Sequence, residues 1–468
     1  MSLAFVLFAR RDNYTLDMFY NQNMSLLLSR ALRVSPAASI AFIGAGGKTT
    51  AMFQLARELS AKTPVIVTAS AHLGVWQTPQ ADKHLVVDSI ESIERSLVEL
   101  QDITLITGLV NNDRTKPVDE DVLNWLNRFC KEKSLPLLIE ADGSRGKPLK
   151  AWAEHEPPIP EFVNQVVQVV GLTGMGKILN DSNVHRAEIY SSLSSLNIEE
   201  VITPEIATKI LTHPQGGLKN IPANARKTIL LNQADTPELQ SIGHGMAHEL
   251  LKTYEVVVVA SLKNNEIYAV HESIAGVILA AGESSRYGMP KQLLDWKGQP
   301  FVRAVAEKAI EAGLSPVLVT VGTNEEQVGA AVSDLNVKIV RNNDWKSGQS
   351  SSIKVGVKAL QEDSKVGAAI FLLVDQPQVT TSILRALVEK HAEGLYPVVA
   401  PMVIDQRANP VLFDRETFQD LLQLEGDVGG RAVFHKYRVE YLPWHDDRLL
   451  LDVDTPEQYQ RLISDDTL

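Results

Sequence analysis

The chain has 468 residues, of which 44% are hydrophobic and 22% charged, a composition typical of a soluble globular protein with roughly two to four domains. Its formal net charge of −12 argues against the broad basic surface that nucleic-acid binding requires, but it allows a local pocket for a small anion. The single cysteine, Cys130, excludes an internal disulfide and fits a reducing, cytoplasmic setting. No run approaches the roughly 18 apolar residues of a membrane helix. From the net charge we expect no nucleic acid as a partner, and from the absence of such a run we expect no membrane.

Residues 1–23 have neither a helical nor a strand period, and Met24 opens a good amphipathic stretch. We therefore expect residues 1–23 to be an unstructured extension, with a structured arm as the alternative. From residue 24 to 265, short apolar runs such as SIAFIG (39–44) and EVVVVAS (255–261) alternate with amphipathic segments. Continuous apolar runs are typical of parallel strands buried on both faces, and their alternation with helices predicts a three-layer α/β domain with a mostly parallel sheet.

The run SIAFIG leads directly into a glycine-rich loop and a helix, in the stretch SIAFIGAGGKTTAMFQLARELSA. Such a loop can cradle phosphate, because it offers helix N-terminal amides, one ammonium group and hydroxyls able to ligate Mg²⁺. The loop is P-loop-like but incomplete, since Phe42 stands where the first glycine of G-x-x-x-x-G-K-[ST] would be, and spacing alone leaves nucleotide binding open. The loop residues predicted to bind a nucleotide are Gly44, Gly46, Gly47, Lys48, Thr49 and Thr50.

Polar residues follow later strands of the same half. Glu140 and Asp142 end the run LPLLIEAD, a position suited to acids that hold a metal ion or orient water, and LLNQAD (230–235) is similar to the Asn-Lys-x-Asp turn that reads guanine, with Gln233 in place of lysine. Together GAGGKTT, EADGSR, VHR and H-P-x-G-x-x-K resemble the selenium-dependent hydroxylase accessory protein family over about 24–262. The resemblance implies a role in the maturation of molybdenum hydroxylases, and the loop makes an NTP the candidate ligand.

The strand pattern pauses at LKNNEIYAVHES (262–273), a polar stretch with an Asn-Asn turn signal, and then restarts. We place a domain boundary there and predict a second three-layer α/β domain over residues 274–468. Its first strand, GVILA, leads into AAGESSRYG at the sheet edge where open α/β folds bind ligands. Gly282 allows an anion to approach the backbone, Arg286 can bind phosphate through two N–H groups, and Lys291 supplies a point charge; a glycine turn with two solvated cations is the alternative.

The stretch L-A-A-G-x-S-x-R-x-G-x-x-K-Q-L-L resembles the signature of nucleotidyltransferases, and most closely that of the molybdenum cofactor cytidylyltransferase family, over nearly all of 275–465. The resemblance implies a Rossmann-like nucleotidyltransferase fold that transfers CMP from CTP to Mo-molybdopterin and releases pyrophosphate, with Mg²⁺ as cofactor. It implies catalytic roles for Arg286, Lys291 and Asp375. The residues implied to bind the nucleotide are Leu279, Ala280, Ala281, Gly282, Gly348 and Ser352.

Acidic residues supply the expected metal site. Asp375 ends the buried run AAIFLLVD, and LLLDVDTPEQY adds Asp452 and Asp454; each of these aspartates has helix capping as its alternative role. The segment LEGDVGGR matches a family motif through Asp427 and Arg431, which the resemblance assigns to the acceptor side. Ser352 has a competing interpretation too, since it lies in a serine-rich helix start.

The chain departs from the family pattern at Ala408-Asn409-Pro410, where Gly-His-Pro is common, and this leaves open how the acceptor binds. A cytidylyltransferase for a sugar or alditol phosphate would share the loop, the metal acid and the fold. A nucleotide-dependent chaperone that binds and delivers the finished cofactor is the alternative from another class. We expect an apo-molybdenum hydroxylase as the recipient, and we expect fusion to raise the effective concentration of one site near the other.

Overall fold

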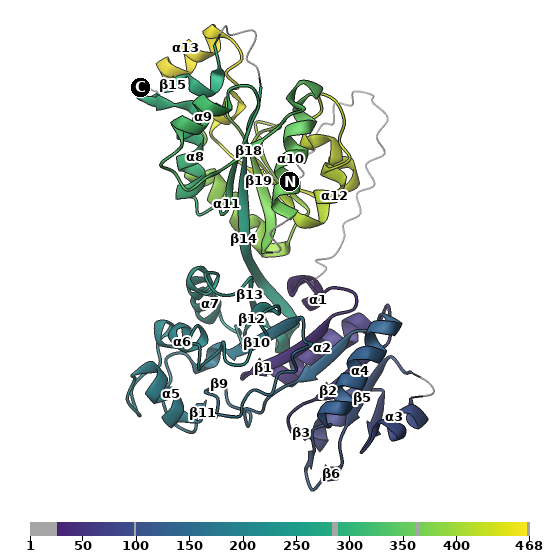
Figure 1. Cartoon of the computed structure of the whole chain (residues 1–468). Coiled ribbons are helices and arrows are strands. Elements are labelled where there is room, and N and C mark those ends of the chain that lie inside the picture. The colour runs from purple at the N-terminus through teal and green to yellow at the C-terminus, as the bar shows by residue number, and fades with distance from the viewer. Residues whose placement is uncertain (1–25, 98–99, 283–288, 362–364, 466–468) are drawn as a thin grey trace, which may run out of the picture.

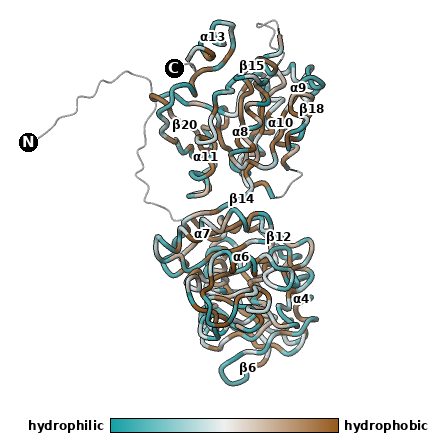
Figure 2. The backbone as a smooth tube through the Cα atoms, turned by 90° about the vertical axis from the view of Figure 1, so that its left-hand side faces the viewer, coloured by the Kyte–Doolittle hydropathy of each residue, from teal (hydrophilic) through white to brown (hydrophobic). Residues whose placement is uncertain are grey.

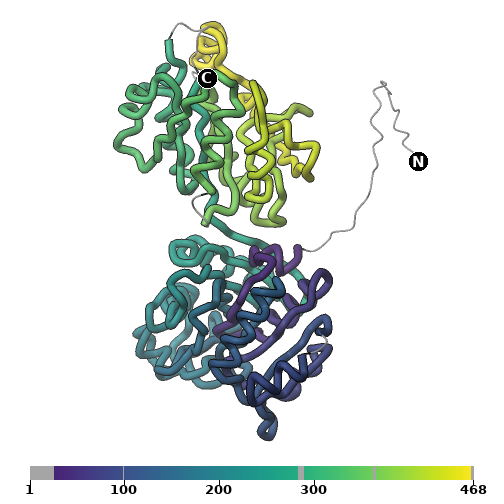
Figure 3. Tube along the Cα trace, turned by 45° about the vertical axis from the view of Figure 1, so that its right-hand side comes forward, coloured from purple at the N-terminus to yellow at the C-terminus, as the bar shows by residue number. Residues whose placement is uncertain are grey.

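The structure, a computed structural model, describes residues 26–97, 100–282, 289–361 and 365–465. The predicted extension, residues 1–23, and the predicted phosphate ligand Arg286 lie outside these ranges. Two α/β bodies lie end to end, and one long strand, β14, passes from the first into the second (Figure 1). Figure 3 follows the chain from the purple and teal first body into the green and yellow second body.

The first body is built on a mostly parallel sheet. Its strand order is β4-β5-β2-β8-β1-β10-β12-β13, and all of these neighbours pair in parallel. The strands are β1 (Ser39–Gly44), β2 (Val65–Ala69), β4 (Lys83–Val86), β5 (Ile103–Thr107), β8 (Leu137–Glu140), β10 (Gln165–Gly171), β12 (Arg226–Asn232) and β13 (Val256–Ser261). The helices are α1 (Leu28–Ala31), α2 (Lys48–Ser60), α3 (Ile90–Ser96), α4 (Glu120–Lys133), α5 (Ala187–Ser194), α6 (Pro204–Leu211) and α7 (Pro237–Leu250).

Three short ladders complete this body. They are β3 (Leu73–Gly74), β7 (Arg114–Thr115) and β6 (Val110–Asn111) in one small sheet, and β9 (Leu149–Lys150) with β11 (Val184–His185) in another. The central strand β1 explains why the sequence run is apolar throughout: Ile40 and Phe42 pack into the core on one face of the sheet, and Ala41 and Ile43 into the core on the other. Burial on both faces confirms the predicted three-layer α/β class.

The second body is also a three-layer α/β fold. Strands β18-β17-β14-β19 run parallel, β22 continues the sheet antiparallel to β19, and β20 with β21 and β23 completes it. The strands are β14 (Glu266–Ala280), β15 (Asp295–Trp296), β16 (Gln299–Pro300), β17 (Val317–Val321), β18 (Lys338–Arg341), β19 (Val366–Leu373), β20 (Val398–Val403), β21 (Gln406–Arg407), β22 (Val411–Asp414) and β23 (Val439–Pro443). The helices are α8 (Phe301–Glu311), α9 (Glu325–Ala331), α10 (Gln349–Gln361), α11 (Thr381–Gly394), α12 (Phe418–Leu421) and α13 (Pro456–Asp465).

Strand β14 belongs to both sheets. Its first half pairs antiparallel with β13, as in Val258↔Val270, and its second half pairs parallel with β19, as in Val277↔Phe371. The predicted pause in the strand pattern at 262–273 is therefore wrong, because most of this stretch is strand. The polar residues that suggested a pause are tolerated because most of residues 266–273 are exposed or only partly buried, whereas residues 274–278 are buried throughout.

The antiparallel pairing of β13 with β14 makes the two parallel sheets run in opposite directions. The carboxyl ends of the first body's strands therefore lie at one end of the molecule, and those of β14, β17 and β19 at the other (Figure 1). Since β14 has 15 residues and a strand rises about 3.3 Å per residue, these two edges are separated by about 50 Å. The fusion therefore holds the two edges at a fixed separation, and a raised effective concentration of one site near the other stays a prediction.

A buried ionic cluster joins the two bodies. Arg33, which follows α1, donates to Glu272 on β14 at 2.6 Å and to Asp414 at the end of β22 at 2.6 Å. Both carboxylates are 0% exposed. His391 of α11 lies 2.7 Å from Asp414, and Arg226 lies 3.6 Å from Glu272. Since the cluster draws on both bodies, it ties their relative orientation to buried charge pairs.

Each of the two bodies has its own hydrophobic interior. Figure 2 shows hydrophobic segments inside each body and hydrophilic segments on the outer turns. Across the described ranges, no helix combines the length and the apolar character of a membrane span.

Candidate functional sites

In the second body, a cleft of about 540 Å³ opens at the carboxyl ends of β14 and β19. Its lining gathers predicted residues from four separate stretches of the sequence: Leu279, Ala281, Gly282, Lys291, Gly348, Ser352, Asp375 and Asp427. Ala280 is an exception, because its methyl group packs in the core and its carbonyl accepts a hydrogen bond from Gln292 at 2.7 Å. The alternation of side chains along β14 therefore turns the Ala280 methyl group away from the cleft, and nucleotide binding by Ala280 stays a prediction.

Lys291 lies among carboxylates in this cleft. Its Nζ donates to Asp454 Oδ1 at 2.5 Å and lies 3.9 Å from Asp375 Oδ2. Burial raises the pKa of Asp375 to about 6, and the nearby Asp452 carboxylate adds to the increase. Burial and Asp454 likewise raise the pKa of Asp452, which accepts a hydrogen bond from Gln376 at 2.7 Å.

The three aspartates are close enough to repel one another, a situation that a divalent cation relieves. Among the described residues, however, no group of three or more His, Cys, Asp or Glu side chains is arranged to hold a metal ion as it stands. Asp375, Asp452 and Asp454 would therefore have to adjust to bind one together.

The capping alternatives for these acids do not match the structure. Thr380, five residues after Asp375, occupies the N-cap position of α11. At the last helix, α13, the amide of Gln458 donates to Thr455 Oγ1 at 3.3 Å. Asp454 instead turns its carboxylate toward Lys291, so neither acid is used as a cap.

The loop before α10 closes one side of the cleft. Gly348 has φ 103°, and a Cβ atom there would lie 2.5 Å from the backbone of Asp427, so this close approach requires glycine. Asp427 Oδ1 accepts from the amide of Gln349 at 3.2 Å. Ser352 Oγ accepts from the buried Asn342 at 3.0 Å, so its hydroxyl is already oriented where it meets the cleft.

A second cleft of about 450 Å³ adjoins the first and shares Leu279, Gln349, Leu373 and Asp427 with it. Its remaining walls are mostly apolar and consist of Ile353, Phe371, Val411, Phe413, Leu421, Val428, Gly429, Gly430 and Ala432, with Asn409 and Arg431 as polar members. Both predicted acceptor residues, Asp427 and Arg431, therefore line this cleft. Asn409, which belongs to the triplet that departs from the family pattern, lines it too.

In the first body, the glycine-rich loop joins β1 to α2 through residues 45–47 alone. Gly47, the N-cap of α2, has φ 118°, and a Cβ atom there would lie 2.6 Å from Asn232 Nδ2. The amide of Ala51 is bonded to Gly47 O within the helix, whereas the amides of the first helical turn have no intrahelical acceptor. This is the arrangement that an anion at a helix N-terminus requires.

Lys48 and Asp142 form part of a buried network beneath the loop. Lys48 Nζ donates to Gly44 O at 2.8 Å and lies 3.2 Å from Asp142 Oδ1. Asp142 Oδ2 accepts from the Gly44 amide, from Lys150 and from Trp152. Although burial alone would raise the pKa of Asp142, Lys48 and Lys150 hold it below its usual value. Asp142 therefore braces the loop, and its role as a metal or water-orienting acid stays a prediction.

Glu140 lines the same cleft as Asp142 and contacts the first turn of α2. Thr49 Oγ1 donates to Glu140 Oε2 at 2.7 Å and accepts from Gln77 at 2.8 Å. A threonine after the loop lysine and an acid at the end of the neighbouring strand are the pair that holds Mg²⁺ in P-loop nucleotide sites. Burial raises the pKa of Glu140, while Lys48 opposes that increase.

These residues line a cleft of about 840 Å³. Its predicted members are Gly47, Lys48, Thr49, Thr50, Glu140 and Asp142. Arg114, Arg145 and Arg186 add positive charge to its walls, and Arg186 is paired with Glu156. Burial and the Arg186 guanidinium lower the pKa of His185 to about 4, so this lining histidine is neutral at physiological pH. The positive charge on the walls of this cleft suits an anionic ligand.

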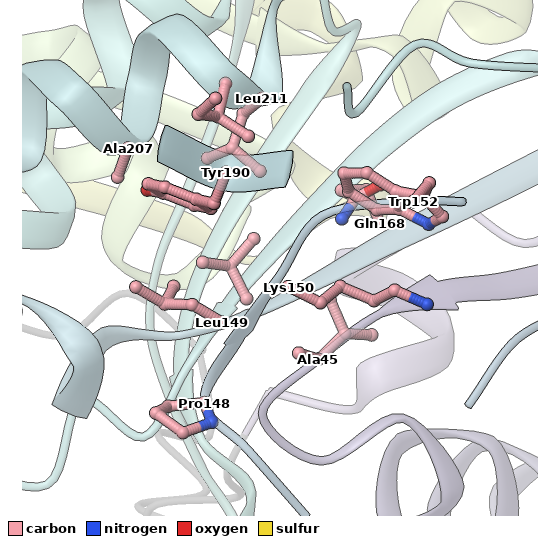
Figure 4. A pocket seen from close by; sticks show the side chains of 12 residues that line it. Ala45, Pro148, Leu149, Lys150, Trp152, Gln168, Tyr190, Ala207 and Leu211 are labelled. Carbon is pink, nitrogen blue, oxygen red and sulfur yellow. The ribbon is translucent and has the colours of Figure 1, made fainter. Parts of the chain in front are cut away.

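A much smaller cavity of about 10 Å³ lies behind the loop, lined by Ala45, Lys150, Trp152, Gln168 and Tyr190 among others (Figure 4). Gln168 Oε1 and the Tyr190 hydroxyl are buried there without a hydrogen-bond partner. Its volume is about that of a single water molecule, so it is a structural cavity and not a ligand site.

Sequence reasoning missed Lys150 and Trp152 as the partners of Asp142. Both stand in the quoted stretch PLKAW, and their spacing of two along an extended segment was the available signal, because it puts both side chains on one side of the backbone. Asn232 was part of a quoted motif, but its contact with the loop depends on strand order.

Comparison with known proteins gives two family matches. The YqeC protein model matches residues 40–188, and the MobA-like NTP transferase domain model matches residues 276–441. Protein YqeC of Escherichia coli, whose name describes it as uncharacterized, is 30% identical over 42% of this chain and 75% of its own length. Nicotine blue oxidoreductase of Paenarthrobacter nicotinovorans is 31% identical over 41% of this chain and 96% of its own length. Molybdenum cofactor cytidylyltransferase of Escherichia coli is 24% identical over 39% of this chain and 92% of its own length.

Proposed function

Because this chain belongs to the YqeC protein family through its first half and to the MobA-like NTP transferase family through its second, we propose that it is a CTP:molybdopterin cytidylyltransferase fused to an NTP-binding accessory domain. We assign residues 24–265 to the accessory unit and residues 274–468 to the transferase. The observation that carries the proposal is Lys291, which lies between Asp375 and Asp454 in a cleft that the Leu279–Gly282 strand end also lines.

In the proposed reaction, the terminal phosphate of Mo-molybdopterin attacks the α-phosphorus of CTP, the bond to the β-phosphate breaks, and pyrophosphate leaves. That phosphate is ionised near neutral pH, so the site needs no general base and contributes alignment and charge neutralisation. Lys291 would neutralise the phosphates that approach each other, and the Gly282 end of β14 would leave room for them. The Ala281 methyl group faces the cleft and would narrow it against a purine.

The adjoining cleft supports an acceptor with a flat ring. Its apolar walls, which include Phe371 and Phe413, suit the face of a pterin, and Arg431 supplies a cation for an anionic substituent. Mg²⁺, when bound, would supply charge neutralisation for the leaving pyrophosphate. Asp375, with Asp452 and Asp454 beside it, would hold the ion, and the repulsion among these carboxylates supports that assignment.

The test is pyrophosphate release by the full chain with Mg²⁺ and CTP, GTP or ATP, offered Mo-molybdopterin or a sugar phosphate as the acceptor. We expect release with CTP and Mo-molybdopterin, and a loss of at least about 100-fold in Lys291→Ala, since transition-state charge neutralisation is removed. Lys308→Ala is the matched control, because Lys308 pairs with Glu311 on the outside of α8. Release with the sugar phosphate alone would favour the alditol or sugar-phosphate enzyme.

In the accessory unit, the amides of Gly47–Thr50 and the Lys48 ammonium would bind the nucleotide phosphates, and Thr49 with Glu140 would hold Mg²⁺. Calorimetry of NTP binding at this site should show a loss of at least about 10-fold in Lys48→Ala, because one charged phosphate contact disappears. If Lys48→Ala abolished hydroxylase maturation while Lys291→Ala left it intact, the chain would be a cofactor-delivering chaperone and not a transferase.

The two sites open at opposite ends of the molecule, about 50 Å apart along β14. The transferase product therefore has no shared cleft through which to reach the accessory unit. We propose that an apo-molybdenum hydroxylase receives the product from the transferase end, while the accessory unit acts on a separate step of maturation.

A further inference from the structure

One segment in contact with the glycine-rich loop has no role in the proposed function: the turn Asn232–Asp235, at the end of β12. The strands β1, β10, β12 and β13 are consecutive neighbours in the sheet and run in parallel. Their carboxyl ends therefore lie in a row, from the glycine-rich loop through this turn to Ser261 and Leu262 at the end of β13. A nucleotide whose phosphates lie at the loop has this row of strand ends beside it.

Asn232 ties three of these segments together. Its side chain is buried, Nδ2 donates to Gly46 O in the loop at 2.7 Å, and Oδ1 accepts from the amide of Leu262 at 3.0 Å. Both ends of the carboxamide are thus in use. These hydrogen bonds hold the loop, the turn and the end of β13 in fixed positions relative to one another. A site that recognises a nucleotide base needs such preorganisation.

Asp235 is held at the exposed end of the same turn. The Ser261 hydroxyl, fully buried, donates to Asp235 Oδ1 at 2.5 Å, and the amide of Ala234 donates to Ala260 O at 3.0 Å. No described residue donates a hydrogen bond to Asp235 Oδ2. The carboxylate is therefore oriented by a buried partner while it still presents acceptor capacity to solvent.

The distance that the turn spans is close to the distance between the base edge and the first phosphate of a nucleotide. Asp235 is three residues after Asn232, which contacts the loop, and three residues of extended chain span at most about 10 Å. That is about the distance from the Watson–Crick edge of a purine to its first phosphate.

We propose that Asp235 reads a guanine base, so that the accessory unit is specific for guanine nucleotides; this inference rests on the proposed nucleotide site at Gly46–Thr50. A carboxylate is an acceptor only, and guanine presents two adjacent donors, N1–H and the exocyclic N2 amine. Adenine presents the acceptor N1 on that edge, and cytosine presents the acceptor N3, so either base would face the carboxylate with a lone pair. Each charge-assisted hydrogen bond favours guanine by roughly 10-fold or more.

The experiment measures diphosphate binding by calorimetry with Mg²⁺ on the full chain carrying Lys291→Ala, which weakens the second nucleotide site. We expect GDP to bind at least about 100-fold more tightly than ADP, which lacks both donors, and at least about 10-fold more tightly than xanthosine diphosphate, which keeps N1–H but has a carbonyl oxygen in place of the N2 amine. In Asp235→Asn the preference should move from GDP to xanthosine diphosphate, because the amide accepts from N1–H and donates to the C2 oxygen. Ser261→Ala should reduce the preference for GDP, and Asp334→Asn, on the surface of the second body, is the control that should change nothing.

Three results would overturn the proposal, and they separate it from the proposed function. Equal affinity for GDP and ADP, with binding still lost in Lys48→Ala, would leave the nucleotide site standing and remove the base reading. An Asp235→Asn variant that weakens all three diphosphates equally would give Asp235 a structural role only. Binding of none of the diphosphates or of ATP would overturn the nucleotide site itself, and the guanine assignment with it.

Discussion

Removing the Arg33 guanidinium should destabilise the junction between the two bodies. Arg33→Met keeps the unbranched stem and deletes the cation, which leaves Glu272 and Asp414 buried at 0% exposure without their shared partner. Breaking a buried ion pair from one side costs about 3–5 kcal/mol. We expect the lower end, about 3 kcal/mol, because Arg226 still lies 3.6 Å from Glu272 and His391 lies 2.7 Å from Asp414.

Scanning calorimetry of the metal-free chain at pH 7.5 measures this loss, which for a domain of roughly 200 residues lowers the melting temperature by about 6–12 °C. Arg303→Met is the matched control, since Arg303 makes the same two-bond contact with Asp334 at the surface and should change stability little. We also expect the second body to unfold separately from the first in Arg33→Met.

The pH dependence provides a second check on Arg33→Met. Burial opposes ionisation of Asp414, but His391 and Arg33 together hold its pKa well below its usual value of 3.8. A carboxyl group whose pKa is lowered by folding stabilises the fold above its unfolded-state pKa, and this stabilisation is lost as the pH falls. The difference in the free energy of unfolding between wild type and variant should therefore shrink below about pH 4. A loss under about 1 kcal/mol at pH 7.5, or an undiminished loss at pH 3, would refute the reasoning.

Two further predictions concern the sites. Gly47→Ala should lower NTP affinity of the accessory unit by at least about 10-fold while pyrophosphate release is unchanged, because the new Cβ would lie 2.6 Å from Asn232 Nδ2 and a φ of 118° disfavours alanine; calorimetry beside the transferase assay measures both. Asp375→Asn should abolish pyrophosphate release yet raise the melting temperature of the metal-free chain at pH 7.5. Burial and Asp452 raise the pKa of Asp375 to about 6, so wild type loses stability as the pH rises from about 4 to 6; equal melting temperatures at pH 7.5 would contradict this.

Much of both sites could be predicted from local sequence. Apolar runs without a polar alternation are typical of strands buried on both faces, and a glycine, a lysine or an acid directly after such a run must lie at a sheet edge. Lys48, Glu140, Lys291 and Asp375 were found in this way, and all four line clefts at those edges.

What a strand-end side chain contacts could not be predicted in this way. Asp142 has the same local signal as Glu140, yet it is buried under Lys48 and Lys150 as a brace. Ala280 stands inside the matched motif, but the alternation along β14 turns its methyl group into the core. These outcomes depend on packing against segments distant in sequence, which a local pattern does not encode.

The sequence by itself determined the two α/β units, their order and several of the polar residues that line their clefts, because those features follow from short-range periodicity and strand-end chemistry. Only the tertiary structure decided that β14 serves both sheets, that the two sites open at opposite ends, and that Asn232 reaches the glycine-rich loop. The physical reason is strand pairing: which strands become neighbours, and in which direction they run, depends on contacts between residues far apart along the chain.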